Sequence, residues 1–283
     1  MNIDIICPLY NAKKYIENIQ KSLEMQKDVN ISKIRYVITN TNDNIENILD
    51  KYNCTYSKIE KEEFSHSLVR ENEVYKSNAD IIVFITQDVI IKDEKWLYNL
   101  IRGIEKGECE AAFSRQLCLN NSIEKYTREK NYPEKSYIVS KNDLEKLGLR
   151  TFFFSDAASA IKRDIFVKLK GYDAKKLPIN EDMYFAYKLI MNDYRIKYEA
   201  DSEVIHSHKF TLKQLYKRYY DTGKFFKQNS YLDKYGTNGT GAGLAKYILK
   251  RAIKEKNIKV LLEFVPNMSA RFIGMKVGKL NGK

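Results

Sequence analysis

The chain has 283 residues, of which 43% are hydrophobic and 30% charged, with only 12 glycines and 4 prolines. This composition excludes collagen-like and disordered chains, and the length suffices for a core that folds without disulfide or metal. The longest apolar runs fall far short of the ~20 residues that span a bilayer. The N-terminus lacks the features of a signal peptide. The four cysteines form no CxxC pair, so we expect reduced thiols in a cytoplasmic protein.

The positive charge is confined to the last quarter of the chain. Met1 to His208 carries 32 basic and 33 acidic residues, whereas Lys209 to Lys283 carries 17 basic and only four acidic ones. We therefore predict a near-neutral domain at 1–208 and a basic helical region at 209–283. Lysines interleaved with apolar residues are typical of segments that bind membrane lipid or nucleic acid, and a solvated lysine-rich face is the alternative.

Strand and helix patterns alternate through the first 86 residues. We predict strands at 2–7, 33–39, 54–59 and 80–86, and helices at 12–26, 45–52 and 67–77. The last of these strands is a continuous apolar run, typical of a central strand that is covered on both faces. The order βαβαβαβ predicts an α/β fold with a mostly parallel central sheet and flanking helices.

The remainder of the chain is less regular. We predict helices at 96–104 and 183–191, and strands at 110–114, 151–156, 195–200 and 203–205. The strand at 151–156 is aromatic and leads into four small residues. Helical spacing of apolar residues continues through 212–226 and again through 244–264. We predict that the glycine-rich segment 236–243 is a flexible joint between these two helices.

Ligands of mostly parallel sheets bind beyond the carboxyl ends of the strands. The segments at those ends are 8–11, 39–42, 64–70 and Gln87-Asp88. No GxGxxG follows the first strand and no GxxxxGK[ST] is present, which argues against a dinucleotide-binding Rossmann site and against a P-loop.

Several motifs together resemble the family-2 glycosyltransferases, which have the nucleotide-diphospho-sugar transferase (GT-A) fold. They are Pro8-x-Tyr10-Asn11, Gln87-Asp88, Glu181-Asp182 and His206-Ser207-His208, the last followed by a basic helix. With the segment FSHSLVREN at 64–72, they are similar to the pattern of bacterial rhamnosyltransferases, in which Gln-Asp stands where other members carry Asp-x-Asp. The resemblance covers residues 3–228.

The resemblance implies an inverting transfer of a sugar, most simply L-rhamnose from dTDP-rhamnose, to a lipid-linked or polysaccharide acceptor in bacterial cell-wall or capsule synthesis. The leaving diphosphate must be neutralised, which Mg²⁺ or Mn²⁺ does in such sites. Asp88, at the mouth of a central strand, is the expected metal ligand. We expect His206 or His208 to be a further ligand or to contact the diphosphate. Alternate side chains of an extended segment point opposite ways, so we expect only one of them, His206, to face the metal.

The reaction also needs a base for the acceptor hydroxyl. We expect Asp182 to take this proton and Glu181 to orient the acceptor or support Asp182. The alternative is a pair of acids that merely stabilise the first turn of a helix.

The remaining expected contacts are to the nucleotide sugar. They are Pro8, Tyr10 and Asn11 at the nucleobase, His66 and Arg70 at the diphosphate, Gln87 at the sugar or a metal-bound water, and Thr39 and Asn40 in the loop after the second strand. Many family members carry an aspartate in that loop, where this chain reads Thr39-Asn40-Thr41-Asn42. The nucleotide contact there departs from the family pattern.

We expect the basic helices to lie on the inner face of the cell membrane, with lysines against anionic headgroups, close to a lipid-carried acceptor. The alternatives are a glycosyltransferase that uses another nucleotide sugar, or a non-catalytic protein that binds membrane or nucleic acid. The near-neutral first three quarters and the absence of a nucleic-acid module argue against nucleic acid as a partner.

Overall fold

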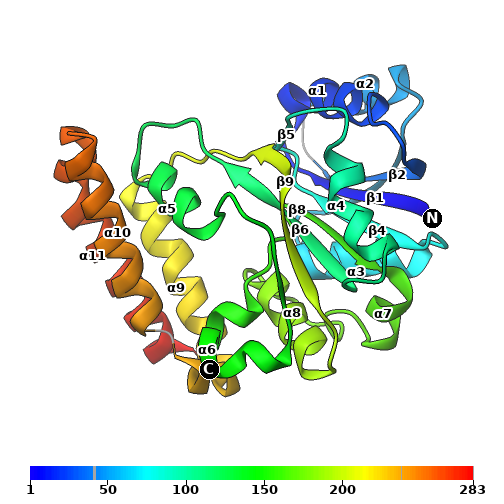
Figure 1. The fold of residues 1–283 in the computed structure, drawn as a ribbon. Helices are drawn as coiled ribbons and strands as arrows, with labels where there is room; N and C mark the ends of the chain where they lie inside the picture. The colour runs from blue at the N-terminus through cyan, green and yellow to red at the C-terminus, as the bar shows by residue number, and fades with distance from the viewer. Residues whose placement is uncertain (41–42, 237, 283) are drawn as a thin grey trace.

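The computed structural model describes residues 1–40, 43–236 and 238–282. Within these residues the chain forms a nine-stranded sheet flanked by helices, with α9, α10 and α11 along one side (Figure 1). The strands are β1 (Asn2–Leu9), β2 (Asn30–Thr39), β3 (Thr55–Ile59), β4 (Ile81–Ile85), β5 (Ile90–Ile91), β6 (Ala111–Leu117), β7 (Tyr137–Val139), β8 (Ala158–Lys162) and β9 (Ile196–Ile205).

Helices connect most of these strands. They are α1 (Lys13–Glu24), α2 (Glu46–Lys51), α3 (His66–Lys76), α4 (Trp96–Glu105), α5 (Ile123–Asn131), α6 (Leu144–Leu147), α7 (Arg163–Lys168), α8 (Glu181–Met191), α9 (Leu212–Gln228), α10 (Asn238–Lys254) and α11 (Ile258–Asn281). Three 3₁₀ helices lie at Lys141–Asp143, Gly148–Phe152 and Ser230–Tyr235. Among the helices of the described residues, none combines the length and apolar character that crossing a bilayer requires.

The sheet has the order β3-β2-β1-β4-β8-β6-β9-β5, and β7 pairs with β9. Strands β1, β2, β3, β4, β6 and β9 run in one direction, whereas β5, β7 and β8 run in the other. The prediction of a mostly parallel α/β sheet is therefore confirmed. The carboxyl ends of β1, β4 and β9 meet at one edge, which is where the candidate site forms.

Strand β4 shows why the predicted apolar run is continuous. Ile81, Val83 and Ile85 pack into the core under α1, α2 and α4, whereas Ile82 and Phe84 pack into the second core with α3, α7 and α8. Successive side chains of a strand point to opposite faces, and both faces of this strand are covered by helices. All five residues are fully buried, so β4 holds the segment that follows it rigidly.

Two strand predictions are wrong. The aromatic run 151–156 ends a 3₁₀ helix at Phe152 and continues without strand pairing, because Phe152, Phe153 and Phe154 all pack into the same core. A strand would send alternate rings to opposite faces. The two strands predicted at 195–200 and 203–205 are one strand, β9, in which an irregularity in the pairing with β6 absorbs the polar residues between them.

The C-terminal helices differ in their boundaries from the prediction. Position 237 lies outside the described residues, but α10 begins at Asn238, so most of the glycine-rich segment is helical and not a joint. The single pattern at 244–264 is divided between α10 and α11 by a turn in which Lys256 has φ +52°.

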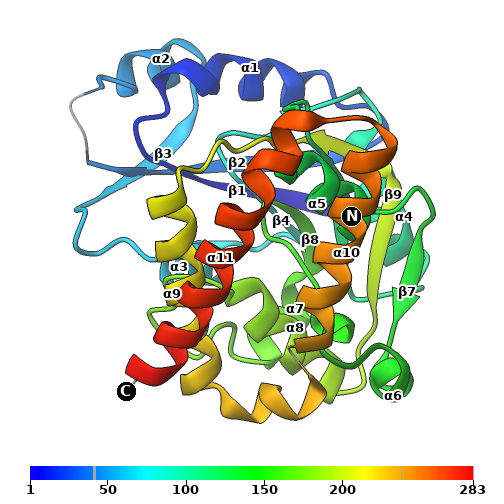
Figure 2. The same ribbon diagram turned by 90° about the vertical axis from the view of Figure 1, so that its left-hand side faces the viewer.

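Helices α9 and α11 pack at unusually short range. A Cβ added to Gly274 would lie 2.5 Å from the Tyr216 carbonyl oxygen, and one added to Gly278 would overlap the Tyr220 carbonyl. Only glycine allows this approach. Figure 2 shows α11 on the outside of the molecule, and the two helices pack side by side along most of α9, whose Phe225 and Phe226 reach the core on its other side.

Candidate functional site

A cavity of about 680 Å³ lies at the carboxyl edge of the sheet. Its wall includes the ends of β1 and β2, the segments that follow β4 and β9, the start of α8, and residues of α3, α5 and α9. The predicted site residues that line it are Pro8, Tyr10, Thr39, His66, Arg70, Gln87, Asp88, Glu181, Asp182, His206 and His208. Residues from six separate segments of the chain, up to 200 positions apart, therefore face one space.

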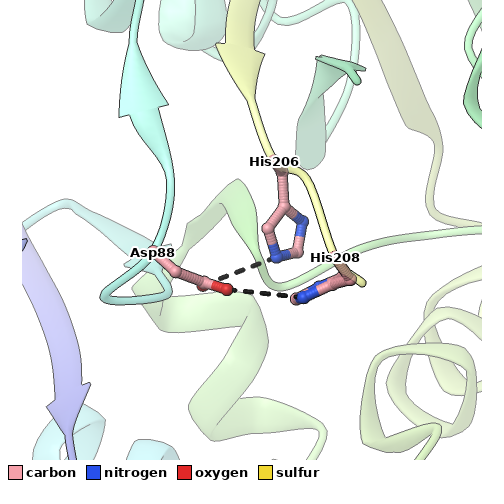
Figure 3. A group of neighbouring side chains, drawn as sticks. All are labelled: Asp88, His206 and His208. Atoms are coloured by element: carbon pink, nitrogen blue, oxygen red, sulfur yellow. Dashed lines mark ion pairs between the residues drawn. The ribbon is translucent and has the colours of Figure 1, made fainter. Parts of the chain in front are cut away.

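Asp88 and two histidines form a compact group in this cavity (Figure 3). Asp88 follows β4, and both histidines follow β9. The Nε2 atom of His206 lies 3.5 Å from Asp88 Oδ1, and the Nδ1 atom of His208 lies 3.6 Å from Asp88 Oδ2. One potential ligand atom from each residue lies within 4.8 Å of the other two, which is the spacing that a single cation needs.

The expectation that only one histidine faces this group is wrong. Strand β9 ends at Ile205, so both histidines lie in the irregular segment after it, and the alternation of an extended strand does not apply. Their rings lie edge to face with centroids 4.3 Å apart, and both contact the same carboxylate.

The protonation states in this group suit a cation. Burial lowers the pKa of both imidazoles, that of His208 to about 4, so both rings are neutral at pH 7 and have a lone pair to offer. Burial alone would raise the pKa of Asp88. The contacts of its two oxygens with His206 and His208 outweigh burial and hold that pKa well below its ordinary value. One carboxylate and two neutral imidazoles are a donor set that fits a divalent cation.

Gln87 makes a contact that the sequence did not predict. Its side-chain amide pairs with the backbone of Tyr10, accepting from the amide nitrogen at 2.7 Å and donating to the carbonyl at 2.8 Å. The residue before Asp88 thus joins the end of β4 to the loop after β1, where Tyr10 is 43% exposed and borders the cavity.

The acid pair begins α8, as the sequence predicts. Asn180 precedes it in the left-handed conformation, with φ +59°, and ends the preceding loop. Glu181 is buried and accepts a hydrogen bond of 2.5 Å from Nη1 of Arg70, which is 1% exposed. Arg70 also donates to the Asp156 carbonyl at 3.2 Å. Loss of either member of such a buried pair costs about 3–5 kcal/mol, so Arg70 holds Glu181 firmly in place.

Asp182 has the electrostatic character of a base. Burial raises its pKa, and the negative charges of Glu181 and Asp156 raise it further, to well above the ordinary value. A carboxyl group whose pKa approaches the working pH is better suited to accept a proton from a hydroxyl. The backbone amide of Met183 donates to Asp182 Oδ1 at 2.7 Å, which leaves the other oxygen available to the cavity.

Two predicted residues do not line the cavity. Asn11 is exposed with φ +49°, and Asn40 is exposed and donates from its side chain to Glu60 at 3.2 Å. Thr39, the last residue of β2, lines the cavity, whereas Thr41 and Asn42 lie outside the described residues. The hydroxyl of Thr39 is buried without a partner.

Several lining residues were not predicted. They include Lys61, Arg128, Ser155, Asp156 and Arg218, together with the segment Pro178–Asn180. The small residues after Asp156 were a signal, since they form β8 beside β4 and bring this aspartate to the sheet edge. Arg218 belongs to the basic region, so its position in the cavity required the packing of α9 to be known.

The chain is similar to proteins whose family and fold are known. The chain matches the family described as glycosyl transferase family 2 over residues 4–170. The O-antigen chain rhamnosyltransferase RfbN of Salmonella typhimurium is 30% identical over 99% of this chain and 90% of its own length. The O-antigen chain rhamnosyltransferase WbaN of Salmonella anatum is 29% identical over 97% of this chain and 88% of its own length.

Solved structures agree in fold. The mannosyltransferase PcManGT from Pyrobaculum calidifontis, in complex with GDP-Man and Mn²⁺, has a TM-score of 0.67 at 14% identity, covering 99% of this chain and 87% of that chain. S. aureus TarS 1–349 in complex with UDP-GlcNAc has a TM-score of 0.59 at 16% identity, covering 90% and 73%. A family match over more than half of the chain and a near-full-length relative at 30% identity lead to one conclusion: this chain belongs to glycosyl transferase family 2.

Proposed function

We propose that this glycosyltransferase moves L-rhamnose from dTDP-rhamnose to a growing, lipid-linked cell-surface polysaccharide, with inversion at the anomeric carbon. The observation that carries the proposal is that the Asp88–His206–His208 group and the acid pair Glu181-Asp182 line the same cavity. The rhamnosyltransferase names of two relatives, aligned over nearly the whole chain, support the sugar. Family membership favours this enzyme over the non-catalytic alternatives.

In the proposed reaction Asp182 accepts the proton of an acceptor hydroxyl. The hydroxyl oxygen forms a bond to the anomeric carbon while the bond from that carbon to the diphosphate oxygen breaks, and the electron pair leaves with the nucleoside diphosphate. A single displacement of this kind inverts the anomeric configuration. Glu181, held by Arg70, keeps the start of α8 and thus Asp182 in position. Lys61 and Arg218 are cations placed to bind diphosphate oxygens, since Arg70 is already occupied by Glu181.

Asp88, His206 and His208 are the residues that would hold a divalent cation. When bound, the cation supplies Lewis-acid stabilisation of the leaving diphosphate. Mg²⁺ strongly prefers oxygen ligands, whereas imidazole nitrogen suits transition metals, so this group favours Mn²⁺ over Mg²⁺.

The nucleotide is tested by thermal shift with dTDP, UDP and GDP, each added with Mn²⁺. We expect dTDP to give the largest rise in the unfolding temperature, because it is the nucleotide part of the proposed donor. A ligand at 100 times its Kd stabilises the folded state by about 2.7 kcal/mol. Hydrolysis of dTDP-rhamnose, followed by release of dTDP, then tests the sugar. A larger shift with UDP or GDP contradicts the thymidine donor and favours a glycosyltransferase with another nucleotide sugar.

We propose residues 1–208 as the catalytic domain and residues 209–283 as a helical region that adds Arg218 to the cavity and binds an anionic membrane surface on the cytoplasmic side. Helix α11 supports the second role with a row of exposed apolar side chains: Ile258, Leu262, Val265, Phe272, Ile273 and Leu280. At 100° per residue these six fall within an arc of about 100°, the width of an amphipathic face. Lys276 lies inside this row and Lys259 at its edge.

Flotation with vesicles of phosphatidylcholine and phosphatidylglycerol tests the membrane proposal. We expect the double substitution Leu262→Ser and Phe272→Ser to lower the bound fraction about tenfold or more, because two large apolar side chains no longer enter the interface. Added salt lowers it too, since lysines contribute through charge. Met25→Ser changes a comparably exposed side chain on the opposite side of the sheet and serves as the control. Equal flotation of all three proteins would rule out the α11 face.

A further inference from the structure

Gln116 lies behind the histidines, outside the set of residues that line the cavity. It is in β6, at the middle of the sheet, and is 1% exposed. The β6–β9 pairing places it opposite Val204, and the backbone amide of His206 donates to the Leu117 carbonyl at 2.9 Å. The sheet register thus brings the Gln116 side chain against the His206 ring.

The Gln116 amide contacts three side chains. Its Oε1 atom accepts a hydrogen bond from Nη1 of Arg128 and lies 2.9 Å from Nδ1 of His206. Its Nε2 atom donates to the hydroxyl of Ser155 at 2.8 Å. The amide oxygen is therefore shared by neighbours from α5 and from the segment after β9, and the amide nitrogen is held by the segment before β8.

These contacts determine which way round the amide lies. A guanidinium group donates hydrogen bonds and accepts none, so the amide atom that faces Arg128 must be the oxygen. The same oxygen faces His206 Nδ1, and two acceptors cannot bond to each other. Nδ1 of His206 therefore carries the proton, and in the neutral ring Nε2 has the free lone pair. Nε2 points toward Asp88 at 3.5 Å, which is longer than an ordinary N–H···O hydrogen bond, so this contact does not fix a proton on Nε2.

We infer that Gln116 is a positioning residue that selects the Nδ1–H tautomer of His206 and so presents Nε2 to the cation. The binding of a cation at Nε2 depends on the proposed function, whereas the tautomer of His206 follows from the contacts of Gln116 alone. Groups that orient the ring of a metal-binding histidine typically change metal affinity 10–100-fold when they are removed.

The experiment has one readout without metal and one with Mn²⁺ alone. The chain has three histidines, so long-range ¹H–¹⁵N spectra of protein labelled with ¹⁵N-histidine contain three ring patterns, and His206→Gln identifies that of His206. We expect the Nδ1–H pattern for His206 in the wild type and in Gln116→Glu, whose carboxylate still accepts from Nδ1–H. In Gln116→Leu we expect a mixture of tautomers. Electron paramagnetic resonance then measures Mn²⁺ affinity, with an expected 10–100-fold loss in Gln116→Leu and a change of less than about threefold in Gln116→Glu.

Gln20→Leu is the matched control. Gln20 is a buried glutamine on α1 that is hydrogen-bonded to Tyr36 and Glu24, away from the cavity, so the same substitution there should leave Mn²⁺ affinity unchanged. An Nε2–H pattern for His206 in the wild type overturns the inference even if no variant folds. Equal losses of affinity in Gln116→Glu and Gln116→Leu also overturn it. If the wild type shows the Nδ1–H pattern but binds no Mn²⁺, the inference survives and the proposed cation site fails.

Discussion

The substitution Asp182→Asn is expected to lower kcat by about 10²–10⁴-fold, the usual contribution of a general base, while the Kd for the nucleotide changes little. Asparagine keeps the shape of the side chain and its hydrogen bond from Met183 but does not accept the acceptor proton. The measurement is the single-turnover rate of sugar transfer, together with nucleotide binding by calorimetry. Asp193→Asn is the matched control, because it makes the same change at an exposed left-handed position just beyond the other end of α8.

The pH dependence gives a second readout of the same residue. The rate should rise with pH as Asp182 ionises, and its raised pKa places this rise above the range of an ordinary carboxyl group. Asp156→Asn removes one of the negative charges that raise this pKa, so the rise should move to lower pH. Transfer at a normal rate by Asp182→Asn, or a pH profile that does not move in Asp156→Asn, would contradict the assigned role of Asp182 as the base.

The substitution Asp88→Asn is expected to abolish Mn²⁺ binding at micromolar metal and to lower the rate of donor hydrolysis about 10²–10³-fold, as for loss of one preorganised electrostatic contact. The neutral amide removes the charged ligand and leaves two imidazoles. Asp88 is half-buried against both histidines, so this change acts at the centre of the group. Mn²⁺ affinity by paramagnetic resonance and dTDP-rhamnose hydrolysis are the measurements.

The control for Asp88 is Asp201→Asn, an aspartate whose side chain is 65% exposed and pairs with Arg102 at the surface. It should retain both metal binding and hydrolysis. If Asp88→Asn hydrolyses the donor at the wild-type rate and with the wild-type response to Mn²⁺, the carboxylate does not hold the cation. The proposed cation site at Asp88, His206 and His208 would then be wrong.

These two aspartates were predictable for a local reason. Each follows or begins an element whose pattern is strong: Asp88 comes after a run of five buried apolar residues, and Asp182 opens a helix. The ends of such elements are determined by neighbouring residues in the sequence, and parallel strands bring their carboxyl ends to one edge. The succession of the first four strands along the chain and the basic character of the last quarter could also be predicted from local sequence patterns.

The direction of the two histidines, the partner of Arg70 and the role of Gln87 were decided only by the tertiary structure. Each depends on a contact between segments that lie 77 or more positions apart, such as Arg70 with Glu181 and Gln87 with Tyr10. Gln116 also depends on such a contact, because His206 lies 90 positions away, although Arg128, which fixes the direction of its amide, is only 12 positions away. The pattern of neighbouring residues indicates which positions are apolar or charged. Hydrogen-bond geometry depends instead on how distant segments pack against one another, and this packing depends on the whole chain.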